Sequence, residues 1–180
     1  MRRVLLLIVL VTFGGAVGAA HAPKLAAQSS TPRIGALHFS TVVDWQSGTR
    51  DSLLISNNDD GELRLAANRD QGVFTSSPIK TDFSFNAVGA VWRAEVTQGT
   101  SLKLEVRGGP TDDQLGGWRT LTAGDARSQS DDGALALESV LPFPADSAVL
   151  QFRATLNTTV ANASPLLSEM TIKYISSGVG

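Results

Sequence analysis

The feature that most constrains the fold is a period of two in the apolar residues of 83–106. In the segments AVWRAEV and LKLEV, the first residue and every second residue after it are apolar. Successive side chains of a strand point to opposite sheet faces, so this pattern predicts two strands, each with one buried and one solvent-exposed face. Glu105 is expected on the exposed face. The intervening TQG predicts a hairpin closed around Gln98 and Gly99.

The same alternation recurs towards the C-terminus, in LQFRATL at 150–156 and in MTIKY at 170–174. Glycine- and Asx-rich segments separate the candidate strands, as in GGPTDDQLGG at 108–117, and such residues are typical of turns. No stretch shows a helical stripe of useful length. The sequence therefore predicts an all-β fold, an antiparallel two-sheet sandwich with jelly-roll-like connectivity.

The N-terminus has the three-part layout of a secretory signal peptide. Arg2 and Arg3 precede the apolar run VLLLIVLVTF, and small residues follow. An exported protein is therefore expected, with an uncleaved anchor helix as the alternative. The predicted organisation is a signal peptide at 1–20, a flexible leader at 21–43, the β-sandwich domain at 44–175, and the start of a linker or a free tail at 176–180.

Composition excludes several classes of site. The chain has no cysteine, so disulfides and thiolate metal sites are excluded, and stability must come from packing. Its formal net charge is −2 and its basic residues are scattered. Nucleic acid is therefore not an expected partner, because the basic patch that attracts it is missing.

Catalytic and metal-binding residues are not predicted in this chain. The two histidines, His21 and His38, both fall in the predicted leader, whereas a zinc site or a Ser-His-Asp triad needs histidine within the folded region. Three aspartate pairs lie in glycine-containing turns and are interpreted as turn-forming, with a glycosidase pair as the alternative. A calcium ion in the loop SNNDDGEL is a weaker alternative, because its spacing differs from that of an EF-hand. The pairs are Asp59 with Asp60, Asp112 with Asp113, and Asp131 with Asp132.

The three tryptophans are the remaining candidates for ligand contact. Trp92 falls on the apolar face of a predicted strand and is interpreted as core. Trp118 in GGWRTL and Trp45 in VVDWQSG lie nearer loop edges. A tryptophan at such a rim stacks on a sugar ring or seals the end of a sandwich. Trp118 and Trp45 are therefore the candidate glycan contacts.

Three stretches in order also resemble a known family: GVFTSSPIKTDFSFNAVGAVWRAEVTQGTSLKLEVRGG, then GGWRTL, then LQFRATL leading to SPLLSEMTIKY. They resemble the β-sandwich region ahead of the catalytic domain in some bacterial secreted N-acetylmuramoyl-L-alanine amidases of the peptidoglycan-recognition type. The resemblance covers 44–174 and implies a zinc amidase acting between muramic acid and the stem peptide of peptidoglycan. In that family the zinc ligands lie in the catalytic domain, and no position of this chain matches them.

These observations predict a secreted, non-catalytic accessory module that acts at the bacterial cell envelope. Its expected partners are peptidoglycan or another envelope glycan, and a neighbouring catalytic domain. Two alternatives stay open: a purely structural or protein-interaction domain, and a fragment of a zinc-dependent amidase whose catalytic domain is absent here.

Overall fold

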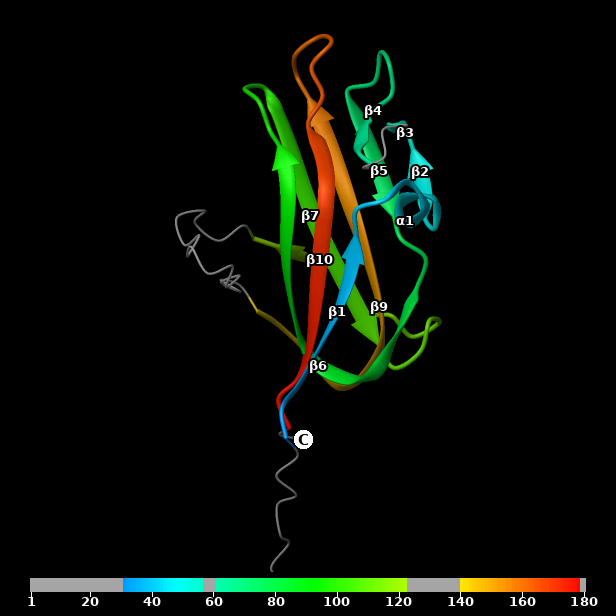
Figure 1. Cartoon of the computed structure of the whole chain (residues 1–180), viewed down its shortest axis with the longest axis vertical. Helices are drawn as coiled ribbons and strands as arrows, with labels where there is room; N and C mark the ends of the chain where they lie inside the picture. Colours follow the sequence, from blue (N-terminus) through cyan, green and yellow to red (C-terminus); the bar gives the residue numbers. More distant parts are fainter. Residues whose placement is uncertain (1–30, 57–60, 123–139, 179–180) are drawn as a thin grey trace, which may run out of the picture.

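A computed structural model describes residues 31–56, 61–122 and 140–178 (Figure 1). Every strand pair in it is antiparallel, which confirms the predicted all-β class. No helix of these residues has the length and apolar character that spanning a membrane requires. The elements are β1 (Arg33–Phe39), α1 (Val42–Gln46), β2 (Thr49–Asp51), β3 (Leu53–Ile55), β4 (Leu63–Leu65), β5 (Gln71–Thr75), β6 (Ile79–Glu95), β7 (Thr100–Gly109), β8 (Arg119–Leu121), β9 (Leu141–Thr158) and β10 (Leu166–Ser176).

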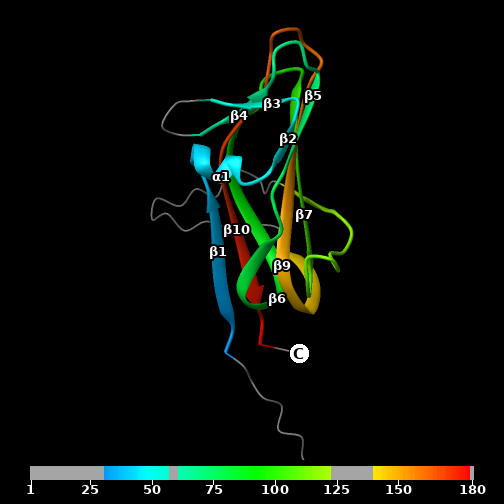
Figure 2. The same ribbon diagram turned by 90° about the vertical axis from the view of Figure 1, so that its right-hand side faces the viewer.

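Two long strands, β9 and β10, organise the fold into two layers. β9 pairs with β5 and β7, and β8 extends this layer by pairing with β7. β10 pairs with β1, β6 and β4. β6 connects the layers, because it also pairs with β9. Figure 2 shows β1 and β10 on one side and β7 and β9 on the other. Most neighbouring strands are distant in sequence, so the predicted jelly-roll-like sandwich is confirmed.

The core lies between the layers. Phe39 of β1 and Phe152 of β9 belong to different layers, and their ring centroids are 4.7 Å apart in an edge-on arrangement. The apolar residues predicted to alternate inward along the two long strands are all buried, which confirms that part of the pattern. These residues are Leu150, Phe152, Ala154 and Leu156 of β9, and Met170, Ile172 and Tyr174 of β10.

The predicted hairpin of 83–106 is wrong, although both of its strands form. β6 pairs with β9 and β10, whereas β7 pairs with β8 and β9. From Gly89 to Glu95, the part that leads into the turn, β6 pairs with β10, whereas β7 pairs with β9. The TQG turn therefore carries the chain from the layer of β10 to the layer of β9. Gly99 adopts a φ of +80°, a conformation that favours glycine. Val96, expected to face inward, lies near this turn and is 52% exposed.

The predicted leader at 21–43 contains the first strand of the fold. β1 pairs with β10 from Arg33 to Phe39, and Phe39 is buried in the core. Sequence reasoning missed this strand because its alternation is interrupted by Gly35, over which the Tyr174 ring packs so closely that a Cβ has no room. The folded region therefore includes residues before Asp44, the predicted start of the domain.

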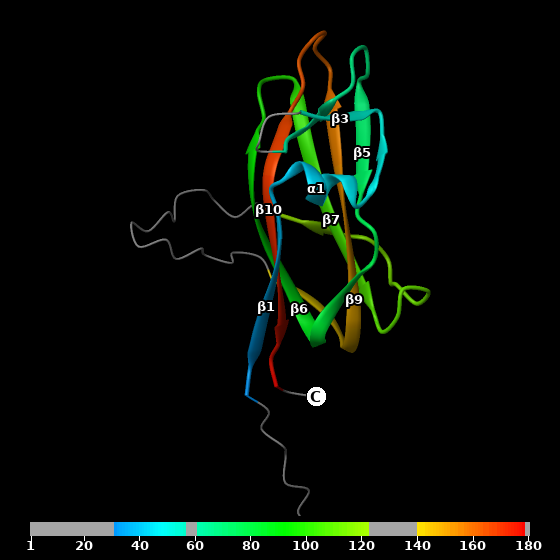
Figure 3. The same ribbon diagram turned by 45° about the vertical axis from the view of Figure 1, so that its right-hand side comes forward.

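Helix α1 follows β1 and runs towards β5 (Figure 3). Thr41 caps it: its hydroxyl oxygen accepts from the Asp44 backbone N–H, and the Asp44 carboxylate accepts from the Thr41 backbone N–H in return. This reciprocal arrangement is a capping box. It fixes the start of a helix of one turn and directs Trp45 into the core.

Candidate functional site

The outward side of β7, β8 and β9 carries a connected group of polar and aromatic side chains. In the pairing of β7 with β9, Glu105 lies opposite Arg153 and Arg107 lies opposite Gln151. Thr120 of β8 lies opposite Glu105, and Trp118 is the residue directly before β8. The group is called the Trp118 face and consists of Lys103, Glu105, Arg107, Trp118, Gln151 and Arg153.

Trp118 contacts two cations of this face. The guanidinium carbons of Arg107 and Arg153 are each 4.5 Å from the centroid of its ring. The negative face of an indole attracts a guanidinium at such a distance. Trp118, predicted from sequence as a glycan contact, is therefore half-buried against these side chains and helps to hold both arginines in place.

A chain of hydrogen bonds anchors Arg107. Its Nε donates to Gln151 Oε1 at 2.7 Å, and Gln151 Nε2 donates to the backbone oxygen of Ser76 at 2.6 Å. Gln151 is 7% exposed, so its amide is largely withdrawn from water. Because both the oxygen and the nitrogen of this buried amide are hydrogen-bonded, it has little freedom to rotate, and it therefore fixes the position of Arg107.

Glu105 anchors Arg153 in the same way. Arg153 Nε donates to Glu105 Oε2 at 2.6 Å, and Lys103 Nζ lies 2.9 Å from Glu105 Oε1. Glu105 was expected on the solvent face, but it is only 5% exposed. The hydrogen bond from Arg153, supported by Lys103, holds the pKa of Glu105 below its ordinary value although burial raises it. The buried carboxylate is therefore ionised and paired.

The Trp118 face thus presents fixed hydrogen-bond donors beside an aromatic ring. Sequence reasoning found Trp118 but missed Arg107, Arg153 and their two anchors. Their alternate positions on two strands were the available signal. The sequence did not indicate that β7 pairs with β9, because the spacing of residues within one strand does not show which strand lies beside it.

Trp45, the second predicted glycan contact, is a core residue. It has no exposed surface, and its ring packs against Phe74 and Phe152 at centroid distances of 5.4 Å and 6.5 Å. Its Nε1–H donates to the backbone oxygen of Gly61 at 2.9 Å. The prediction of a sugar contact is corrected, because α1 turns this ring inward and its polar atom already has a partner.

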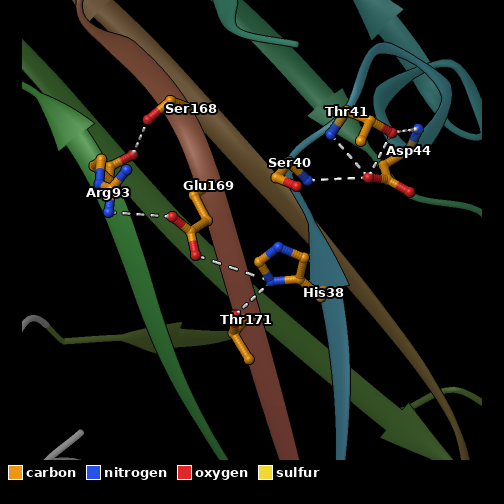
Figure 4. A network of polar contacts seen from close by, with 8 residues as sticks. All are labelled: His38, Ser40, Thr41, Asp44, Arg93, Ser168, Glu169 and Thr171. Carbon is orange, nitrogen blue, oxygen red and sulfur yellow. Dashed lines mark hydrogen bonds and ion pairs between the residues drawn. The ribbon is translucent and has the colours of Figure 1, made fainter. Parts of the chain in front are cut away.

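His38 lies on β1 within the fold, where it joins a second polar cluster on the outer side of the other layer (Figure 4). Its Nδ1 lies 2.9 Å from Thr171 Oγ1 and 4.0 Å from Glu169, and Arg93 is 3.6 Å from the same carboxylate. A catalytic triad needs the nucleophile and the carboxylate on different nitrogens of the imidazole. Here both partners approach Nδ1, so this arrangement cannot relay a proton between them.

The described segments do not fit a zinc site: among them, no three His, Cys, Asp or Glu side chains are grouped so that they could hold a metal ion. Asp112 and Asp113 lie in an exposed turn, where Asp113 accepts a hydrogen bond from Thr111, as the turn interpretation expects. The other two aspartate pairs lie outside the described residues: Asp59 with Asp60, which belong to the loop considered for calcium, and Asp131 with Asp132.

Comparison with known proteins identifies no family. No protein-family model matches the chain, and no curated protein matches it. Several solved structures are similar, and two of them, both at low identity, are described here. That of infectious bursal disease virus Gx strain has a TM-score of 0.44 and 11% identity over 84% of this chain, which spans 34% of that chain. That of TmCBM61, in complex with beta-1,4-galactotriose, has a TM-score of 0.32 and 7% identity over 83% of this chain and 90% of that one.

Proposed function

We propose that this chain is a non-catalytic module that binds glycans through the Trp118 face. The observation that carries the proposal is the contact of Trp118 with two guanidinium groups, each held by a buried partner. Sugars present hydroxyl oxygens that accept hydrogen bonds, so a fixed set of N–H donors suits them. Anchoring by Glu105 and Gln151 orders these donors before the ligand arrives, which lowers the entropic cost of binding.

The proposed place of action is the bacterial cell envelope, with peptidoglycan or another envelope glycan as the ligand. The signal-like N-terminus supports export, and the resemblance of 44–174 to the region ahead of an amidase domain supports peptidoglycan. In this proposal the module holds a neighbouring catalytic domain near its substrate. The chemistry belongs to that domain, including any zinc ion that it binds.

Retention on insoluble peptidoglycan and affinity electrophoresis in soluble polysaccharides test this function. The full chain without residues 1–20 is expected to be retained on at least one polymer. Trp118→Ala should weaken retention about tenfold, because both arginines lose the ring that holds them. Trp118→Phe, which keeps a ring, should lose less.

The matched control is Arg93→Ala, on the outer side of the opposite layer, where the side chain is 79% exposed. It removes an arginine without touching the Trp118 face and should leave retention unchanged. Equal losses in the Arg93 and Trp118 variants, or a wild-type chain retained on no polymer, would contradict glycan binding. If the wild-type chain is retained on no polymer but is captured by an amidase domain, the protein-interaction alternative is favoured.

A further inference from the structure

We propose that the Trp118 face selects glycans that carry carboxylate groups, and that Arg107 and Arg153 together bind the carboxylate. This inference rests on the proposed glycan-binding function and names the class of its ligand. It predicts that removing the negative charge from a glycan weakens binding while the sugar backbone stays the same.

The two arginines are placed to act on one group. Arg107 lies opposite Gln151 and Arg153 lies opposite Glu105 in the β7–β9 pairing, so the arginines are diagonal neighbours on the same side of the layer. Diagonal neighbours in antiparallel strands lie within reach of each other's long side chains. Both guanidinium groups also contact the one ring of Trp118. Both guanidinium groups therefore lie beside the same side chain, Trp118.

Each guanidinium keeps its outer end available. The anchoring bonds use Nε alone, to Gln151 from Arg107 and to Glu105 from Arg153. Within residues 31–56, 61–122 and 140–178, no acceptor bonds the Nη groups of either arginine. The side chain of Arg153 is 33% exposed, so solvent and ligands reach it. The Nη groups are the pair of parallel donors that fit the two oxygens of a carboxylate.

The local charge also favours an anion. The Trp118 face contains three cationic side chains and one carboxylate, Glu105, although the chain as a whole has a net charge of −2. Glu105 is buried and already bonded to Arg153 and Lys103, so it does not compete at the surface. A ligand thus meets a positive area on an otherwise slightly acidic protein, and an anion is attracted there.

These features distinguish a sugar acid from a neutral sugar. A hydroxyl oxygen accepts a single hydrogen bond from one Nη group, whereas a carboxylate accepts two parallel ones and carries the opposite charge. Charge-assisted hydrogen bonds are about twice as strong as neutral ones. We therefore expect about ten- to hundredfold tighter binding of the ionised glycan than of the same glycan with its carboxylates neutralised.

Two polymers serve as probes, each in a charged and a neutralised form. Polygalacturonic acid is compared with its methyl ester, and peptidoglycan is compared with peptidoglycan whose carboxylates have been converted to amides. The expected result is that whichever polymer retains the chain loses at least about tenfold in affinity on neutralisation. Affinity for the charged form should also fall as salt is raised.

The variants are Arg107→Gln, Arg153→Gln and, as the control, Arg93→Gln. The first two should lose the preference for the charged form, and the control should keep it. Arg153→Lys keeps the charge but not the parallel donors, so partial loss is expected. Thermal unfolding of each variant shows whether it is folded. If a glutamine variant is not folded, Arg153→Lys replaces it in the test. Equal retention on charged and neutralised polymers, or retention on a neutral polysaccharide alone, would overturn the carboxylate proposal and leave glycan binding intact; retention on no polymer at all would overturn both.

Discussion

At the scale of single residues, Glu105 is a charged side chain that is buried on the outer face of a sheet. Its carboxylate oxygens lie 2.6 Å from Arg153 Nε and 2.9 Å from Lys103 Nζ, and 5% of the residue is exposed. An unpaired carboxylate at this depth would be costly, and its pairing with Arg153 and Lys103 offsets that cost. The carboxylate therefore fixes Arg153 and depends on it.

This pairing predicts a pH dependence of stability. The pKa of Glu105 is lowered from its ordinary value of 4.5, so its contribution is present above that value and is lost as the pH falls through the lower pKa of the folded state. Glu105→Gln should therefore lose stability at neutral pH, by about 1 to 3 kcal/mol, and depend less steeply on pH below 4.5. Urea unfolding across that range measures both effects. The exposed Glu95→Gln is the control, and identical pH profiles for wild type and Glu105→Gln would refute the prediction.

Single residues also show where sequence reasoning reached its limit. Trp45 and Trp118 were equivalent candidates by their position near loops, yet one is core and the other touches two arginines. The segment TVVD before Trp45 carried the missing information, because Thr41 and Asp44 have the spacing of a capping box. For Trp118 no local signal existed, since Arg153 comes from a strand thirty-odd residues further along the chain.

At the scale of elements, β1 is required to complete the layer around β10. It pairs with β10 along its whole length, and its last residue, Phe39, contacts Phe152 of the opposite layer. Gly35 and the exposed Ile34 and Ala36 give this strand an incomplete apolar pattern. Its place in the fold is therefore set by its partner strand and by one aromatic side chain.

A substitution in β1 should accordingly destabilise the whole domain. Phe39→Ala removes a ring that is 7% exposed and should lower the free energy of unfolding by about 3 to 5 kcal/mol. Ile34→Ala, on the same strand but 65% exposed, should change it by less than about 0.5 kcal/mol. Chemical denaturation of both variants provides the comparison. If the two lose equal stability, β1 is not part of the cooperative unit.

Elements were predicted better than their partners. The period of two located β6, β7, β9 and β10, because it reflects which side chains meet the core. It did not reveal that β6 pairs with β9 and β10 rather than with β7. Hydrogen bonding between strands uses backbone groups that every residue has, so the choice of neighbour leaves no period in the sequence. The Trp118 face depends on that choice, and it was therefore only partly predictable.

At the scale of the whole molecule, eight aromatic side chains form two groups along the core. Phe39, Trp45, Phe74 and Phe152 contact one another in one group, and Phe83, Phe85, Phe143 and Tyr174 in the other. The first group takes its rings from β1, α1, β5 and β9, and the second takes them from β6, β9 and β10. Together with the aliphatic residues between them they form one continuous core, so the layers should unfold as a unit.

A double-mutant cycle tests whether the layers are coupled through the first group. Phe39→Leu and Phe152→Leu remove two rings whose centroids are 4.7 Å apart across the core. Their effects on the free energy of unfolding should deviate from additivity by about 0.5 to 1.5 kcal/mol, the worth of an edge-on aromatic pair. Phe39→Leu combined with Phe85→Leu, from the second group, should be additive within about 0.5 kcal/mol. Additivity in both pairs would mean that β1 and β9 do not pack against each other as described. Coupling confined to the first pair is the expected result, because β1 and β9 face each other across a shared core.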